Sequence, residues 1–376
     1  MKEMKKIIIK VGSSSLVCAD GNINVSMFEK LISTINDLMN QNIEVILVTS
    51  GAIAVGMGKL GLSQKPKNMG LKQACAALGQ ATLMNEYDKF ASKYNLNCAQ
   101  ILVNHDDFEN RTRMLNLTNT FEELFDNGIL PIVNENDALN VEEIKVGDND
   151  TLSSLVASMI NADMLILASD IDGLYDKNPK QYDDAKKIDY VYKIDKTIDM
   201  MVGDITSNVG TGGMETKIKA ARICTKAGCD MAIISSKDIS KIQNLINGDN
   251  IGTIFVSNKV LHSKEHWIVY NTYAKGTIII DDGAKKAILD RKSLLPKGIV
   301  SVEGTFNENT VVFICDKDNN KLAKGITNFS SSDIMKVMGK HSDIAKDLLK
   351  SDKEEVVHAN LMVLLDGDDY DKLKWL

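Results

Sequence analysis

Residues 7–16 read Ile7-Ile8-Ile9-Lys10-Val11-Gly12-Ser13-Ser14-Ser15-Leu16, and this stretch favours one fold class over the others. A short apolar run of β-branched residues is typical of a buried strand, and the glycine and serines after it are typical of a turn. Lys10 ends the run well before the roughly 7–15 apolar residues of a secretory signal peptide. An unpaired buried ammonium is strongly disfavoured. We therefore predict a first strand that ends where Lys10 faces an anion.

Similar apolar runs recur through the first part of the chain, at residues 45–49, 99–103, 130–133, 164–168 and 231–234. They are rich in Ile, Val and Leu and lack clean polar alternation, as expected for strands that are buried on both faces. Helical patterns lie between them, at residues 26–41, 71–94, 114–127, 150–160 and 214–227. This alternation predicts an α/β fold with a mostly parallel sheet sandwiched by helices.

The chain has 376 residues, which is more than one ordinary domain contains. After about residue 260 the pattern changes to short strands bounded by turns, at residues 276–280, 298–303 and 310–314. We expect an α/β domain over residues 1–259 and a small β-rich domain over residues 275–352.

Composition narrows the class of protein further. Hydrophobic residues make up 44% and charged residues 25%, which is typical of a folded protein. The net charge of -7 argues against nucleic-acid binding by the chain as a whole, and no apolar stretch predicts a membrane span. The six cysteines are scattered, with neither zinc-site spacing nor a dense disulfide pattern, so we expect a reduced, cytoplasmic protein.

Polar residues and glycines follow four of the predicted strands, where a parallel sheet places its ligands. They are Lys10 to Ser13, Thr49 to Gly51, Asn134 to Asp137, and Ser169-Asp170. A glycine-rich turn, Val209 to Gly213, leads directly into a helix that carries Lys217. Backbone amides at a helix start favour an anion, and a lysine in the first turn adds a positive charge. These clusters predict an enzyme site that binds an anion.

Two known phosphate motifs do not account for this site. The sequence has no G-x-x-x-x-G-K-[ST] and therefore no P-loop, and the G-x-G-x-x-G match at residues 56–61 lies too far beyond its strand for dinucleotide binding. The segment 147–153, GDNDTLS, has more Asp and Asn than helix capping needs. Together with Asn134 and Asp137 it can bind a cationic or amide-bearing substrate, or hold two lysines in place. His105-Asp106-Asp107 is better explained as a surface loop or a helix start.

Taken together, the motifs resemble the amino acid kinase family, and within it the members that phosphorylate glutamate. The segments that carry the resemblance are IIIKVGSSSL, VILVTSGAIAVG, QACAALGQATLMNEY, PIVNENDAL, VGDNDTLSSLVA, LILASDIDGLYDKNP and GTGGMETKIKAA, in order over about residues 5–255. The tail at 275–352 is similar to a PUA domain, a small β-barrel.

The resemblance implies ATP-dependent phosphorylation of the γ-carboxylate of L-glutamate, the first step of proline biosynthesis. It implies that Asp150 organises Lys10 and Lys217 as the catalytic set, and that Ser50, Asp137 and Asn149 bind glutamate. It further implies that ATP contacts Lys10, Ser169, Asp170, Thr211, Gly212, Gly213, Met214, Glu215, Thr216 and Lys217. Mg²⁺ is expected mainly on the phosphates, without a dedicated protein site. Feedback inhibition by proline and a homo-oligomer, dimer or tetramer, are further family traits.

Two alternatives remain open from the sequence. One is a family relative with another acceptor, such as acetylglutamate or aspartate. The other is an RNA-binding protein that acts through its C-terminal domain, against which the net charge and the clusters at the strand ends both argue.

Overall fold

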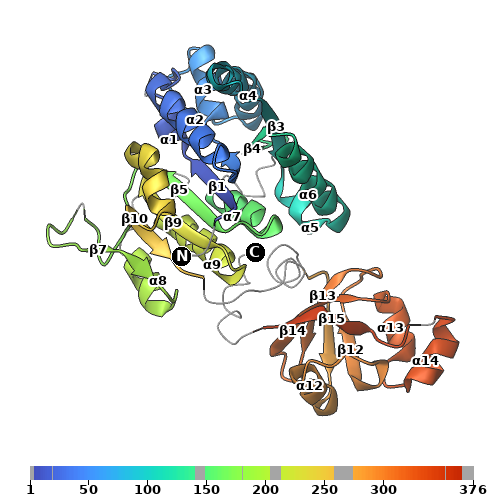
Figure 1. The fold of residues 1–376 in the computed structure, drawn as a ribbon. Helices are drawn as coiled ribbons and strands as arrows, with labels where there is room; N and C mark the ends of the chain where they lie inside the picture. The colour runs from blue at the N-terminus through green and yellow to red at the C-terminus, as the bar shows by residue number, and fades with distance from the viewer. Residues whose placement is uncertain are drawn as a thin grey trace. The chain divides into compact units, whose positions relative to one another are not determined.

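The protein folds into two compact units, Met1–Val260 and Leu261–Leu376 (Figure 1). The computed structural model describes residues 4–18, 20–139, 149–179, 181–203, 213–257, 274–351 and 353–365.

The first unit alternates strands and helices. Its strands are β1 (Lys6–Val11), β2 (Glu44–Val48), β3 (Cys98–Val103), β4 (Leu130–Glu135), β5 (Met164–Ser169), β6 (Leu174–Tyr175), β7 (Lys187–Ile188), β8 (Tyr190–Val191), β9 (Asp230–Ser235) and β10 (Gly252–Phe255). Its helices are α1 (Ser13–Leu16), α2 (Val25–Met39), α3 (Ala52–Lys59), α4 (Met69–Ala91), α5 (His105–Glu109), α6 (Arg111–Asp126), α7 (Asn149–Met159), α8 (Lys196–Gly203), α9 (Met214–Lys226) and α10 (Ile242–Ile246). Short 3₁₀ turns cover Ser92–Tyr94 and Ser236–Lys241.

The main sheet has eight strands in the order β3-β4-β2-β1-β5-β9-β10-β8. The first six strands in this order, from β3 through β1 to β9, pair in parallel. Strand β10 runs antiparallel to β9, and β8 is parallel to β10. The chain leaves β1 for β2 on one side and later returns through β5 on the other side. Ligands bind beyond the carboxyl ends of strands at such a reversal. The central strand β1 therefore delivers its last residues to the place where a site is expected.

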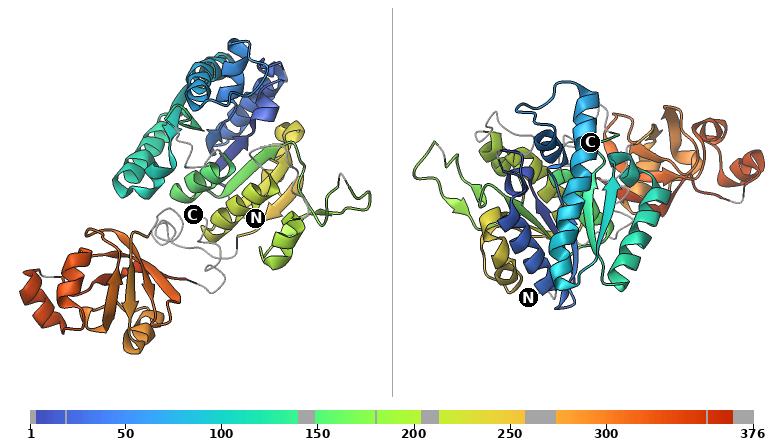
Figure 2. Two further views of the ribbon diagram at one scale, coloured as in Figure 1. Left: turned by 180° about the vertical axis from the view of Figure 1, so that it is seen from behind. Right: turned by 90° about the horizontal axis from the view of Figure 1, so that it is seen from above.

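Helices cover both faces of this sheet (Figure 2). Ile7, Ile9 and Val11 belong to a core that includes side chains of α2 and α4. Ile8 points to the opposite face and belongs to a second core with side chains of α7 and α9. Because side chains alternate along a strand, Lys10 shares the face of Ile8. The strand period thus directs Lys10 toward α7 and α9.

Two glycines allow helices α3 and α4 to pack with their backbones in close approach. A Cβ added at Gly79 of α4 would lie 1.8 Å from the carbonyl oxygen of Ala52, and one at Gly56 of α3 would lie 1.9 Å from that of Cys75. Real Cβ atoms do not come this close to backbone. The glycines at residues 56 and 58 of the G-x-G-x-x-G match therefore lie inside a packed helix rather than in a turn that cradles a phosphate.

The second unit contains a five-stranded sheet in the order β12-β11-β13-β14-β15. Its strands are β11 (Thr277–Ile280), β12 (Ile299–Glu303), β13 (Val311–Cys315), β14 (Lys321–Thr327) and β15 (Val357–Leu364), and its helices are α12 (Asp282–Leu289), α13 (Ser331–Val337) and α14 (Ser342–Leu349), with a 3₁₀ turn at Pro296–Gly298. Strands β11 and β13 pair in parallel and the other neighbours are antiparallel. Strand β15 lies beyond residue 352, where we expected this domain to end.

The structure confirms the six strands and five helices predicted for the first unit, with bounds that differ by at most three residues. It also confirms the three strands predicted for the tail and the helix start at His105. The sequence patterns did not reveal the helices α1, α3, α8, α10, α12, α13 and α14 or the strands β6, β7, β8, β10, β14 and β15. Asn134 was expected on a loop, but it is part of β4 and buried. In the described part of the chain, no helix combines the length and the apolar character that crossing a membrane requires.

Candidate active site

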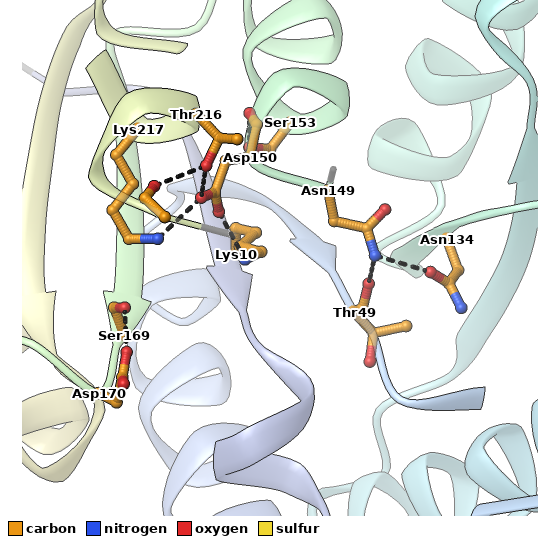
Figure 3. Close-up of polar contacts among 11 residues, drawn as sticks. Lys10, Thr49, Asn134, Asn149, Asp150, Ser153, Ser169, Asp170, Thr216 and Lys217 are labelled. Atoms are coloured by element: carbon orange, nitrogen blue, oxygen red, sulfur yellow. Dashed lines mark hydrogen bonds and ion pairs between the residues drawn. The ribbon is translucent and has the colours of Figure 1, made fainter. Parts of the chain in front are cut away.

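Three charged side chains from three elements meet at the carboxyl end of β1 (Figure 3). The Lys10 Nζ lies 2.5 Å from Oδ1 of Asp150, and the Lys217 Nζ lies 2.9 Å from Oδ2 of the same carboxylate. Thr216 Oγ1 also donates a hydrogen bond to Asp150 Oδ2, at 3.2 Å. Asp150 stands at the second position of α7, and Lys217 in the first turn of α9. The sheet and two helices thus hold two ammonium groups on one carboxylate.

This cluster is shielded from water. Asp150 is completely buried, and the side chains of Lys10 and Lys217 are only 12% and 5% exposed. Burial alone raises the pKa of the Asp150 carboxyl, but the ammonium groups of both lysines outweigh burial and hold that pKa below its ordinary value. Asp150 is therefore ionised at neutral pH, and the three groups together carry one net positive charge. Such a cluster attracts an anion that approaches the lysines.

The start of α9 adds further positive potential beside the cluster. This 13-residue helix begins at Met214 after Gly213, and no side chain in the described part of the protein caps its first amides. Free amide groups and the helix dipole both favour a negative ligand at this end. Gly213 and Glu215 are exposed, while Met214 and Thr216 are half-buried. Thr211 and Gly212, which we predicted to contact ATP, lie outside the described residues.

Ser169 and Asp170 lie at the end of β5, the strand next to β1. Ser169 Oγ donates a hydrogen bond to Asp170 Oδ1 at 3.0 Å (Figure 3). Asp170 is exposed and lines a crevice of about 450 Å³, together with residues such as Ser14, Lys30 and Lys237. These two residues therefore stand at the same edge of the sheet as Lys10.

Asn149 precedes Asp150 and its side chain reaches toward β2 and β4. Its Nδ2 donates to the backbone oxygen of Thr49 at 2.9 Å and to Oδ1 of Asn134 at 3.1 Å (Figure 3). Its Oδ1 is buried and accepts no hydrogen bond from any described residue. Ser50, half-buried, follows Thr49 and precedes Gly51, whose φ of 98° is left-handed. The turn after β2 thus lies beside Asn149.

Asp137 lines a separate small cavity of about 260 Å³ beyond the end of β4. Other residues that line it are Ala52, Gln80, Gln100, Asn136 and Ala138. Burial raises the pKa of the Asp137 carboxyl, and Lys65 offsets that shift only in part. The cavity therefore offers a half-buried carboxylate to a small cationic group.

The structure brings together most of the residues that the sequence predicted for the site. Lys10, Asp150 and Lys217 form one cluster, and Asn149 adjoins it on the side of Ser50 and β4. Sequence reasoning gave no role to Gln80 or Gln100, and it predicted Thr216 only as a contact of ATP. The hydrogen bond from Thr216 to Asp150 was not predicted, and no local pattern marks the two glutamines. Residues 140–148, which include part of the GDNDTLS motif, lie outside the described part of the chain.

An α/β sheet with two lysines, a shared aspartate and a helix start at its carboxyl edge defines a class of enzyme that binds phosphate groups. The model of the amino acid kinase family matches residues 5–235, and that of the PUA domain matches residues 276–349. The chain is 43% identical to "Glutamate 5-kinase" of Carboxydothermus hydrogenoformans over 369 residues, which cover 97% of this chain and 99% of that one. It is 44% identical to "Glutamate 5-kinase" of Caldanaerobacter subterraneus subsp. tengcongensis, with the same coverage. The chain therefore belongs to the amino acid kinase family and, within it, to the glutamate 5-kinase group, with a PUA domain at its C-terminal end.

Proposed function

We propose that this protein transfers the terminal phosphoryl group of ATP to the γ-carboxylate of L-glutamate, as the first step of proline biosynthesis. The observation that carries the proposal is the buried Asp150 carboxylate between Lys10 and Lys217, beside Asn149. The full-length similarity to proteins named glutamate 5-kinase supports the choice of glutamate.

The reaction needs two anions to be brought together. A glutamate side chain has a pKa near 4.3 and is already ionised at neutral pH, so no general base is required. Phosphoryl transfer then depends on positioning and on charge stabilisation. In our proposal Lys10, Lys217 and the first amides of α9 hold the phosphate oxygens, with Ser169 and Asp170 at the same edge. Asp150 positions both lysines and keeps their charges close together.

Mg²⁺ is expected to arrive with the phosphates of ATP. Among the described residues no group of three or more His, Cys, Asp or Glu is arranged to hold a metal. Asp150 already binds two ammonium groups, which fits an ion that is carried mainly by phosphate oxygens. When bound there, Mg²⁺ supplies further positive charge to the phosphates.

The amino group of glutamate is assigned to Asp137 and to Oδ1 of Asn149. The cavity that Asp137 lines, about 260 Å³, has room for an amino acid. A charged ammonium offers three donors to these two acceptors, whereas an acetylated nitrogen has one N–H and no charge. Ser50, in the turn beside Asn149, is assigned to the same substrate. This arrangement favours a free amine over an acetylated one.

The proposal extends to regulation and assembly. We place the protein in the cytoplasm as a homo-oligomer, a dimer or tetramer, that is inhibited by proline. Inhibition by proline and oligomerisation follow from the family resemblance, and the cytoplasmic location follows from the scattered cysteines.

The direct test is an assay of the purified protein with ATP, Mg²⁺ and a panel of acceptors. We expect ATP turnover with L-glutamate, and hydroxylamine should trap the acyl phosphate product. A Lys10→Ala preparation, purified in parallel, controls for a contaminating kinase. Equal or higher activity with N-acetylglutamate or aspartate would show that the substrate is wrongly assigned.

The raised pKa of Asp137 predicts how glutamate binding depends on pH. As the pH falls, Asp137 takes up a proton earlier than an ordinary Asp, whose pKa is about 3.9, and it then loses its attraction for the ammonium. The KM for glutamate should therefore begin to rise at a higher pH than the titration of the substrate carboxylates alone would cause. Initial rates at varied glutamate and pH, with saturating ATP, measure this shift.

The matched control is Asp137→Asn, which keeps the shape of the side chain and removes its charge. Its KM at neutral pH should be about 10- to 100-fold higher, since hydrogen bonds to charged groups contribute about 1.5–3 kcal/mol. The early rise on acidification should be absent in this variant. If wild type and Asp137→Asn have parallel pH profiles, Asp137 does not bind the ammonium.

A further inference from the structure

A chain of four amide side chains extends from the site back to helix α4. Asn149 Nδ2 donates to Asn134 Oδ1, and Asn134 Nδ2 donates to Gln80 Oε1 at 2.9 Å. Gln80 Nε2 then donates to Gln100 Oε1 at 3.0 Å. Asn134 is 1% exposed and Gln80 9%, so water has little access to the central link. Four elements, α7, β4, α4 and β3, each contribute one amide to this chain.

Two backbone groups set the direction of every hydrogen bond in this series of four amides. The Thr49 carbonyl oxygen can only accept, so the Asn149 atom that faces it, at 2.9 Å, must be Nδ2. The backbone N–H of Glu135 can only donate, so the Asn134 atom that faces it, at 3.0 Å, must be Oδ1. Asn134 is then left with Nδ2 toward α4, and only an acceptor there satisfies it. Gln80 Oε1 is that acceptor.

The orientation of these amides also determines which atom Asn149 can present to a substrate. With both of its amide hydrogens donated, Asn149 can only present Oδ1 in the remaining direction. That atom is buried and accepts no hydrogen bond from the residues that the structure describes. A buried acceptor without a partner costs free energy, which a donor on a ligand recovers. An ammonium supplies such a donor.

We propose that Gln80 is a positioning residue for glutamate binding. By accepting from Asn134 it holds Asn134, and through it Asn149, in the orientation that turns Asn149 Oδ1 toward the substrate ammonium. This inference rests on the proposed function. It adds to the recognition of the amino group a residue on α4 to which the sequence analysis gave no role in the site.

The test is Gln80→Met, which keeps the length of the side chain and the helix propensity but removes the acceptor. We expect the KM for glutamate to rise about five- to tenfold, the effect of losing one buried hydrogen bond. Turnover and the KM for ATP should stay within about twofold, because Gln80 is not part of the lysine cluster. Gln41→Met, at an exposed glutamine just after α2, is the matched control and should leave all three constants unchanged. Two results for Gln80→Met would overturn the proposal. One is an unchanged KM for glutamate, and the other is a loss of turnover that accompanies the rise in KM.

Gln80 also lines the cavity of Asp137, so a direct contact with substrate must be distinguished from positioning. The double variant Gln80→Met with Asn149→Ala makes this distinction. If Gln80 acts through Asn149, its substitution should add little to the KM of Asn149→Ala. Equal effects in both backgrounds would mean direct contact and would overturn the positioning role. Failure of the proposed function is a separate result, because the wild-type protein would then not phosphorylate glutamate at all.

Discussion

Asp150→Ala is expected to lower turnover by about 10²–10³-fold while raising the KM for glutamate far less. Removing one preorganised charge at a phosphoryl-transfer site has an effect of this size. Without the carboxylate, the ammonium groups of Lys10 and Lys217 lose the group that each contacts within 3 Å. Two like charges that share a buried site repel, so the lysines will no longer hold their positions. Steady-state kinetics at saturating ATP and glutamate measure the change.

Three variants make this expectation specific. Lys10→Ala should lower turnover over the same range, about 10²–10³-fold. Asn149→Ala should act mainly on the KM for glutamate, because Asn149 is assigned to the substrate and not to the lysines. Asp199→Ala removes an aspartate that is paired with Arg222 of α9 outside the cluster, so turnover should hardly change.

Because breaking a buried ion pair can unfold a protein, Asp150→Asn is the second variant to measure. It keeps the shape and removes the charge, and circular dichroism shows whether it is folded. A folded Asp150→Asn or Asp150→Ala protein with turnover near wild type would show that Asp150 does not organise the lysines.

Gly79→Ala is expected to destabilise the first unit by about 3 kcal/mol, at the upper end of the usual cost of overpacking. The added methyl group would lie 1.8 Å from the carbonyl oxygen of Ala52, and backbone cannot turn aside as a flexible side chain can. Helices α3 and α4 must therefore separate. Because α3 follows Ser50 and α4 carries Gln80, glutamate binding should weaken as well. Urea unfolding, followed on the transition of the first unit, measures the loss.

Gly70→Ala, in the first turn of the same helix, is the matched control. The nearest neighbour of its added Cβ is the side-chain oxygen of Asn68 at 3.3 Å, which can adjust by a few tenths of an ångström. Alanine also has the higher helix propensity. If Gly79→Ala unfolds at the same urea concentration as Gly70→Ala, the close packing of α3 and α4 is not needed for stability.

Much of the fold could be predicted because local patterns of apolar residues specify its strands and helices. An apolar run of about five residues specifies a buried strand, and the 3.6-residue period specifies an amphipathic helix. Helix α3 was not predicted because two glycines interrupt its apolar pattern, and its stability comes from packing against α4. Strand β10 and the edge strand β8 were not predicted because they are short and depend on their neighbours. Such elements form through tertiary contacts that no local window contains.

The features of the site likewise divide into those that the local sequence determines and those that depend on the tertiary structure. The sequence by itself determined that Lys10 ends a buried strand, that a glycine-rich turn leads into the helix of Lys217, and that Asn149 and Asp150 open another helix. Each of these features is local, because turn residues, helix starts and side-chain alternation depend on near neighbours. The family resemblance implied that Asp150 lies between the two lysines. Only the tertiary structure brings both ammonium groups onto one carboxylate and places Gln80 against Asn134 and Asn134 against Asn149. Asp150 and Lys217 are 67 positions apart, and Gln80 and Asn134 are 54 apart. Contacts over such separations depend on how helices pack on a sheet, and that packing is a property of the whole core.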